Sequence, residues 1–275
     1  MRPSSRLLAL PLAALAIAAL TAAPSSASTP PLPNSMAAIG DSITRAYDVC
    51  CWYGDHAGDS WSTGGTWYDG VTSQYERIKK VNGAIAGHNH NDAVTGAKMS
   101  AAATQASNAV AQGAQYVTIL MGANDLCTSS VSTMTSTTTF AAQFRAAMDT
   151  LHAGLPHAHV FVASIPNIYQ LWQVLHTNWL ARSVWSAAHI CQSMLSSSNT
   201  ETQRQQVVAR EQAFNQILAN TCAAYANCKW DGGAVYRYAF SAGQVSTLDY
   251  FHPSLSGQAA LASVTWAASY WPTTA

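Results

Sequence analysis

Short apolar runs alternate along the chain with longer segments of helical character. The runs over 36–39, 116–121 and 159–165 are largely apolar, contain β-branched residues, and are each followed by Gly or Pro, which is typical of buried strands. Weaker strand candidates lie at 78–82 and 234–238. The intervening pattern predicts helices over 98–112, 140–152, 202–226 and 255–270. Strands alternating with helices indicate an α/β protein, a three-layer α/β/α sandwich around a parallel sheet.

The first residues have the pattern of an export signal. Arg2 and Arg6 precede an apolar run of 14 residues over 7–20, and small residues follow up to Ala27. This run is shorter than the ~20 residues of a membrane-spanning helix, so residues 1–27 are interpreted as a secretory signal peptide. We therefore expect a secreted, extracellular protein. Residues 28–35, with three prolines, are expected to form an extended linker.

The remaining chain shows no repeat and no second linker, so residues 36–275 are expected to form a single domain. Only 9% of the 275 residues are charged, and 13 basic residues balance 13 acidic ones. This balance provides no field that would attract a polyanion, which argues against a nucleic-acid partner. We expect a monomer.

Six cysteines in an exported chain predict three disulfides. The spacing of Cys222 and Cys228 fits a bridge at the end of a helix, and the simplest completion pairs Cys127 with Cys191 and Cys50 with Cys51. Fifteen pairings are formally possible, and a bridge between adjacent cysteines is rare and strained. A metal site is the alternative for these residues. We expect none, because no Cys-x-x-Cys pair occurs and no thiol stands at a usual ligand spacing from a histidine.

The carboxyl ends of parallel strands are where such sheets bind ligands. The first candidate there is Ser42 in Gly40-Asp41-Ser42. If a helix starts at this point, the Ser42 hydroxyl lies at its positive end and could act as a nucleophile. The alternative is that Asp41 or Ser42 only caps that helix.

Two further positions could donate hydrogen bonds to an oxyanion. Asn124 follows the 116–121 strand in Gly122-Ala123-Asn124-Asp125, and Gly87 follows the weaker 78–82 strand candidate. Uncharged donors beside a nucleophile would stabilise negative charge that develops in a transition state. The alternatives are an ordinary Asx turn at Asn124 and a simple loop bend at Gly87.

A base for the serine is available near the C-terminus, where Asp249 precedes His252 by three residues. This offset allows the carboxylate to hold one imidazole nitrogen while the other accepts the serine proton. The same spacing also occurs where a pair of residues merely decorates the start of a helix.

Taken together, these four blocks resemble the SGNH or GDSL hydrolase family in order and spacing, from Met36 nearly to the C-terminus. The resemblance implies a flavodoxin-like five-stranded parallel sheet and ester hydrolysis without a cofactor. It implies a catalytic triad of Ser42, His252 and Asp249, with an oxyanion hole formed by Ser42, Gly87 and Asn124. Ile43 replaces the family's leucine, which is a conservative change. Asp41 and Asp125 are expected to brace loops.

A narrower resemblance concerns the substrate. The segments 60–65 and 122–127 are similar to the phospholipase B-like branch and to secreted bacterial lipases and esterases, which implies an acyl ester of a lipid. Aromatic residues also gather in two insertions, and they could line an acyl pocket, form a lid that contacts a lipid interface transiently, or form a small core beneath long loops. These residues are Trp52, Tyr53, Trp61, Trp67 and Tyr68, and then Tyr169, Trp172, Trp179 and Trp185.

The sequence therefore predicts a secreted lipase or esterase, with a carbohydrate deacetylase as the alternative enzyme. A non-catalytic binding module is a further hypothesis, but no triad residue is missing. Another alternative is a secreted structural or interaction protein, which would show no activity on an activated ester. A glycosidase is disfavoured, because none of Glu76, Glu201 and Glu211 is grouped with an aspartate as a catalytic pair.

Overall fold

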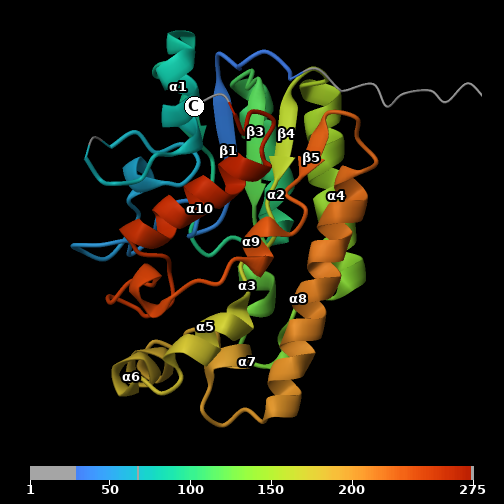
Figure 1. The fold of residues 1–275 in the computed structure, drawn as a ribbon. Coiled ribbons are helices and arrows are strands. Elements are labelled where there is room, and N and C mark those ends of the chain that lie inside the picture. The colour runs from blue at the N-terminus through green and yellow to red at the C-terminus, as the bar shows by residue number, and fades with distance from the viewer. Residues whose placement is uncertain (1–28, 67, 274–275) are drawn as a thin grey trace, which may run out of the picture.

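The computed structural model describes residues 29–66 and 68–273. Five strands and ten α-helices alternate along this part of the chain (Figure 1). The strands are β1 Met36–Gly40, β2 Asn89–Asn91, β3 Tyr116–Leu120, β4 His159–Val162 and β5 Cys228–Trp230. The helices are α1 Gln74–Val81, α2 Ala102–Ala111, α3 Ala123–Leu126, α4 Thr137–Gly154, α5 Ile168–Leu175, α6 Trp179–Ala187, α7 Gln192–Leu195, α8 Glu201–Cys222, α9 Ala234–Arg237 and α10 Leu255–Ala268.

The five strands form one parallel sheet in the order β2-β1-β3-β4-β5. β1 and β3 are buried along their whole length, as their apolar sequences require. In Figure 1, α10 crosses in front of the sheet. Helices α2, α4 and α8 pack successively against one another, with α2 also against β1 and α8 against β4 and β5. The predicted three-layer α/β/α fold is confirmed.

The strand predicted at 78–82 is wrong, because these residues lie at the end of helix α1. Ser73 and Glu76 form a reciprocal capping box that starts this helix. The strand in this part of the sheet is β2, which begins at Asn89, eleven residues after Ile78. Its three residues are polar and half-buried, so no apolar run marks them.

The strand predicted at 234–238 is also wrong. Residues Ala234–Arg237 form the single-turn helix α9, and the last strand is β5, a short edge strand that pairs only with β4. The predicted long helices correspond to α2, α4, α8 and α10 with small shifts at their ends.

Helices α5, α6 and α7 form a group beyond the carboxyl ends of the strands, at the lower end of Figure 1. A disulfide between Cys127 and Cys191 ties this group to the segment after β3, and a second joins Cys222 at the end of α8 to Cys228 in β5. Both pairings are those that the sequence favoured.

The third predicted disulfide is not present, because Cys50 and Cys51 are both free thiols. Two adjacent cysteines can be bridged only in a strained arrangement. Cys50 is half-buried and Cys51 is exposed, with Cys51 in the left-handed backbone region at a φ of 65°.

The predicted linker packs on the domain in its described part. The Trp271 indole donates a hydrogen bond to the Pro30 carbonyl at 2.7 Å, and the Asn82 amide donates to the Pro33 carbonyl at 3.0 Å. The predicted signal peptide, residues 1–27, lies outside the described residues. Within the described ranges, none of the helices combines the length and apolar character that crossing a bilayer requires.

Candidate active site

Ser42 stands directly after β1 in a series of tight turns. Its neighbour Asp41 accepts backbone hydrogen bonds from Thr44 and Arg45 at its carbonyl, and its carboxylate accepts one from the Ile43 N–H at 3.0 Å. No regular helix begins here, so the expected position at a helix N-terminus is wrong. The Ser42 side chain does not cap a helix. It lines a cleft of about 530 Å³ at the carboxyl ends of the strands.

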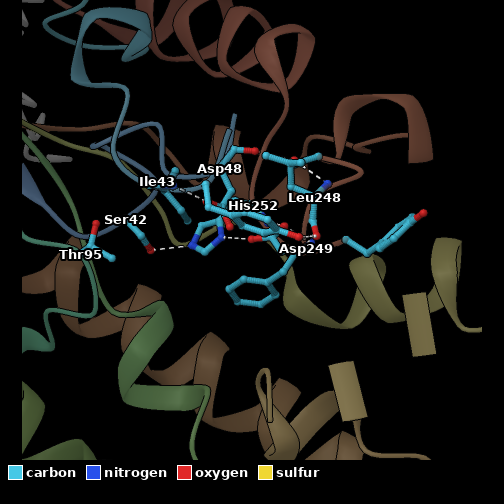
Figure 2. A network of polar contacts seen from close by, with 12 residues as sticks. Ser42, Ile43, Asp48, Thr95, Leu248, Asp249 and His252 are labelled. Carbon is cyan, nitrogen blue, oxygen red and sulfur yellow. Dashed lines mark hydrogen bonds and ion pairs between the residues drawn. The ribbon is translucent and has the colours of Figure 1, made fainter. Parts of the chain in front are cut away.

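His252 and Asp249 come from the loop before α10 and face Ser42 across this cleft (Figure 2). The His252 Nε2 atom lies 2.7 Å from Ser42 Oγ, and Nδ1 contacts Asp249 Oδ2. The other Asp249 oxygen accepts hydrogen bonds from the N–H groups of Phe251 and His252. Since α10 is capped by Ser254, the pair does not merely cap this helix. The arrangement can hold Nδ1 protonated and leave Nε2 to accept the Ser42 proton.

Asp48 is a third acidic residue at this position that the sequence analysis missed. One carboxylate oxygen of Asp48, one carboxylate oxygen of Asp249 and one ring nitrogen of His252 lie within 4.8 Å of one another. Asp48 is 2% exposed, and burial raises the pKa of its carboxyl, with a smaller raising contribution from the nearby Asp249 charge. Figure 2 shows it beside the Asp249–His252 pair. No sequence spacing signals this contact.

Donors for an oxyanion line the same cleft as Ser42. One amide hydrogen of Asn124 is used in a hydrogen bond to the Ala97 carbonyl at 3.0 Å, which orients the side chain and leaves its second hydrogen available. Asn124 therefore does not form the simple Asx turn that was the alternative. The Ser42 backbone N–H makes no hydrogen bond within the described residues. Both groups are uncharged and fixed in position, as stabilisation of a transient oxyanion requires.

Gly87 does not belong to this set of donors, so its predicted role is wrong. It precedes β2 and therefore lies at the amino-terminal ends of the parallel strands, whereas Ser42 lies at their carboxyl ends. The Gly87 N–H donates to the Tyr75 hydroxyl at 3.1 Å. The glycine that follows β2 is Gly96, which lines the cleft with Ser42 and Asn124. Its φ is 80°, and its N–H makes no hydrogen bond within the described part of the chain.

A second, apolar cavity of about 70 Å³ meets the cleft at Phe251 and His252. Its walls come from the residues next to Ser42 and Asn124, from α5 and from the segment before α10. They include Ile43, Ala123, Ile168, Leu171, Val174 and Phe240. None of the insertion aromatics that the structure describes lines this cavity.

The insertion aromatics instead have different roles from one another. Trp61 and Trp185 are buried, and their indoles donate to Thr44 Oγ1 and to the Tyr250 carbonyl, so they support the loops of the site from beneath. Trp52 and Trp179 are exposed. Trp67 lies outside the described residues.

The family model described as GDSL-like Lipase/Acylhydrolase matches residues 36–264 of the chain. The chain belongs to this family. It is accordingly a hydrolase that acts on ester bonds, in agreement with a serine, a histidine and a carboxylate held in hydrogen-bonding distance. Comparison with curated protein sequences gives no significant match.

Solved structures with the same fold include other hydrolases. An α/β hydrolase enzyme from the metagenome of Lake Arreo, Spain, has a TM-score of 0.52 at 15% identity, covering 85% of this chain and 94% of that chain. A GDSL-like lipase candidate from Parabacteroides merdae has a TM-score of 0.51 at 15% identity with the same coverage. A catalytic mutant of an acetylxylan esterase from Geobacillus stearothermophilus has a TM-score of 0.50 at 13% identity, covering 85% and 93%. At these identities the similarity shows the fold alone.

Asp41, the aspartate of the GDSL-like motif, predicts a pH dependence of stability. It is completely buried, and burial raises the pKa of its carboxyl to about 7 from 3.8. Because the folded protein then holds this proton more tightly than the unfolded chain, Asp41 favours folding below pH 4 and loses this contribution as the pH rises to about 7. The full change is on the order of 4 kcal/mol.

Denaturant unfolding at several pH values of the natural chain and of Asp41→Asn measures this effect. Asparagine keeps the acceptor for the Ile43 N–H, so the turn is retained. We expect the free energy of unfolding of the natural chain, relative to that of the variant, to fall between pH 4 and pH 7. A difference that is constant over this range would contradict the prediction.

Proposed function

We propose that the chain is a secreted serine esterase that hydrolyses acyl esters of lipid type. Ser42 is the nucleophile, His252 the general base and acid, and Asp249 the residue that orients His252. The observation that carries this proposal is the apolar cavity that opens at His252, beside the Ser42 hydroxyl.

The proposed reaction has two steps. Ser42 Oγ attacks the ester carbonyl while its proton passes to His252 Nε2, and the tetrahedral intermediate collapses as the leaving alcohol takes that proton. Water then attacks the acyl-enzyme by the same route and releases the acid. The carbonyl oxygen, which is negatively charged in the intermediate, accepts hydrogen bonds from the backbone N–H groups of Ser42 and Gly96 and from the Asn124 side-chain amide.

Loss of one oxyanion donor should lower turnover without weakening ground-state binding. We expect Asn124→Ala to reduce kcat by about 10²–10³-fold, with little change in KM, because the amide is aimed at charge that exists only in the transition state. Steady-state kinetics on a p-nitrophenyl ester measures both constants. An effect confined to KM would instead place Asn124 in substrate binding.

The glycines provide a matched pair for the backbone donor. Gly96 and Gly87 have φ values of 80° and 79°, and at each a Cβ would meet nothing within 4 Å, so alanine introduces the same backbone strain at both. Gly96→Ala should lower kcat by on the order of 10-fold, because strain displaces its N–H from the oxyanion. Gly87→Ala should leave kcat unchanged. Equal losses in the two variants would remove Gly96 from the oxyanion hole.

The substrate proposal rests on the walls of the apolar cavity. The surface that lines it is mostly apolar, so an acyl chain gains from leaving water there while a sugar hydroxyl would lose its hydrogen bonds. The narrow space favours one linear chain. The acyl group would enter the cavity, and the alcohol part would occupy the wider cleft.

Initial rates on p-nitrophenyl and glycerophospholipid esters of increasing chain length, with acetylated xylan beside them, test this proposal. We expect medium or long acyl chains to be preferred, and Leu171→Trp, which fills the cavity, to lower kcat/KM for these chains by on the order of 10-fold while acetate is hydrolysed normally. Leu180→Trp on the exposed side of α6 is the matched control. A preference for acetyl together with release from xylan would contradict the lipid proposal.

A carbohydrate deacetylase is the second candidate, and the wider cleft favours it. Tyr47 and Tyr53 line this cleft, and Tyr53 is 69% exposed. Such rings can stack on sugar faces as well as rest on a lipid surface. The xylan measurement above distinguishes these two substrates.

A further inference from the structure

A thiol, an imidazole and a carboxylate converge in the loop that follows the Ser42 turns. One ligand atom each from Cys50, His56 and Asp59 lies within 4.8 Å of the other two. The His56 and Asp59 side chains are 5% and 13% exposed. This cluster, which we call the Cys50 cluster, is separate from the triad and is not used by the proposed reaction.

The His56 ring is held in the orientation that a metal ligand needs. Its Nε2 lies 3.0 Å from the Trp52 carbonyl, which accepts a hydrogen bond from the Nε2–H. In the neutral ring the lone pair is then on Nδ1, which lies 3.7 Å from Asp59 Oδ2. Metal-binding histidines commonly donate their second ring N–H to a carbonyl in this way, because the bond fixes both the tautomer and the ring direction.

No permanently charged cation faces Asp59. Among the described residues, neither Asp59 nor the neighbouring Asp69 pairs with a lysine or arginine, and the ion-pair partner of Asp59 is the His56 ring. The Asp69 carboxyl lies against that of Asp59. A mostly buried carboxylate next to another acidic group is stabilised by a cation.

We propose that the Cys50 cluster is a zinc site, with Cys50 Sγ, His56 Nδ1 and Asp59 Oδ2 as protein ligands. Thiolate, imidazole and carboxylate are the three ligand types of zinc, whereas calcium and magnesium require oxygen ligands alone. Tetrahedral coordination leaves a fourth position for water. The sequence analysis expected no metal because the chain has no Cys-x-x-Cys pair and no thiol at a usual ligand spacing from a histidine.

The site would fix the loop that forms one wall of the active-site cleft. This loop also contains Asp48, which lies beside Asp249, and Tyr53, whose hydroxyl donates to the Leu248 carbonyl at 3.4 Å. Bound zinc would therefore stabilise the folded chain through this loop. Zinc affinity and the stability of the folded chain, rather than the catalytic rate, therefore test this site directly.

The test uses the folded full chain, stripped of metal with a chelator, with Cys50 and Cys51 as free thiols and the other two disulfides intact. Competition with a chromophoric chelator measures zinc affinity, and thermal unfolding with and without zinc measures stabilisation. We expect one zinc per chain and a higher Tm with zinc. Cobalt should give the charge-transfer absorption of a thiolate ligand. Cys50→Ser should weaken zinc binding by at least on the order of 10²-fold and abolish that absorption.

Cys51→Ser is the matched control, because it removes the adjacent exposed thiol and should retain zinc binding, the Tm increase and the cobalt absorption. Asp59→Asn keeps the size of the side chain and should weaken binding without unfolding the protein. Equal affinity in the natural chain and Cys50→Ser would overturn the proposal. So would the absence of stoichiometric zinc binding in the natural chain with Cys50 and Cys51 reduced.

Discussion

Ser42→Ala should lower kcat by on the order of 10³-fold or more while the protein stays folded. The substitution removes the only atom within hydrogen-bonding distance of His252 Nε2 among the described residues, and no covalent intermediate can then form. The residual rate would come from the oxyanion donors and from binding alone. Steady-state kinetics on a p-nitrophenyl ester, with the Tm as a measure of folding, checks this result.

A covalent probe makes the same prediction independent of turnover. An organophosphorus ester should add once to the natural chain at Ser42, and intact mass should show no addition to Ser42→Ala. Ser107→Ala, which removes a hydroxyl on helix α2 that only bonds within its own helix, is the matched control. Normal turnover or continued labelling of Ser42→Ala would assign the nucleophile to another residue.

His252→Ala should be about as damaging as the loss of Ser42, and Asp249→Ala should be less so. His252 moves the proton, whereas Asp249 holds the ring, and the loss of the carboxylate in such triads costs roughly 10–100-fold less than the loss of the base. Alanine is preferred to asparagine at 249, because an amide N–H facing Nδ1 would favour the wrong tautomer. Steady-state kcat values compare the two variants.

Asp48 gives a structural reason for residual activity in Asp249→Ala. Its carboxyl lies within 4.8 Å of both members of the pair and can accept from His252 Nδ1 when Asp249 is absent. The double variant with Asp48→Asn should then lose the remaining activity, although Asp48→Asn alone has a small effect. Equal activity in Asp249→Ala and the double variant would exclude Asp48 as the second acceptor, and full activity in His252→Ala would require another base.

The chemistry of the site could be predicted because each signal is local. Ser42 and Asn124 lie within four residues of the ends of β1 and β3, whose apolar sequences place them at the carboxyl ends of the strands. Asp249 and His252 share one loop, and their spacing brings the carboxylate to the ring. In each case a short segment determines the position of the functional group.

Gly96 could not be predicted because β2 carries no apolar signal. Its side chains bond to the loop after β1: the Asn89 amide donates to the Thr63 carbonyl at 2.7 Å, and the Asn91 amide donates to the Thr44 carbonyl at 3.0 Å. Polar residues therefore suit this edge strand. With β2 misplaced to 78–82, Gly87 seemed to follow a strand that it in fact precedes.

The loop over 46–59 was equally hidden from sequence reasoning. Ala46, Asp48 and Cys51 have positive φ values, so the chain reverses repeatedly without any helical or strand period. These reversals place Asp48 beside Asp249 and gather the Cys50 cluster. Contacts of this kind depend on tertiary packing and leave no repeating pattern in the sequence.

The separation of Ser42 from His252 along the chain has a consequence for the order in which the protein matures. The two residues are 210 positions apart, and Gln258 reinforces their meeting through hydrogen bonds to the Ile43 carbonyl and the Trp61 N–H. Closing so long a loop is entropically expensive, and contacts of high sequence separation form slowly. Helical structure should consequently recover in refolding before esterase activity does, which makes activity a reporter of the docking of the final helix onto the first loop.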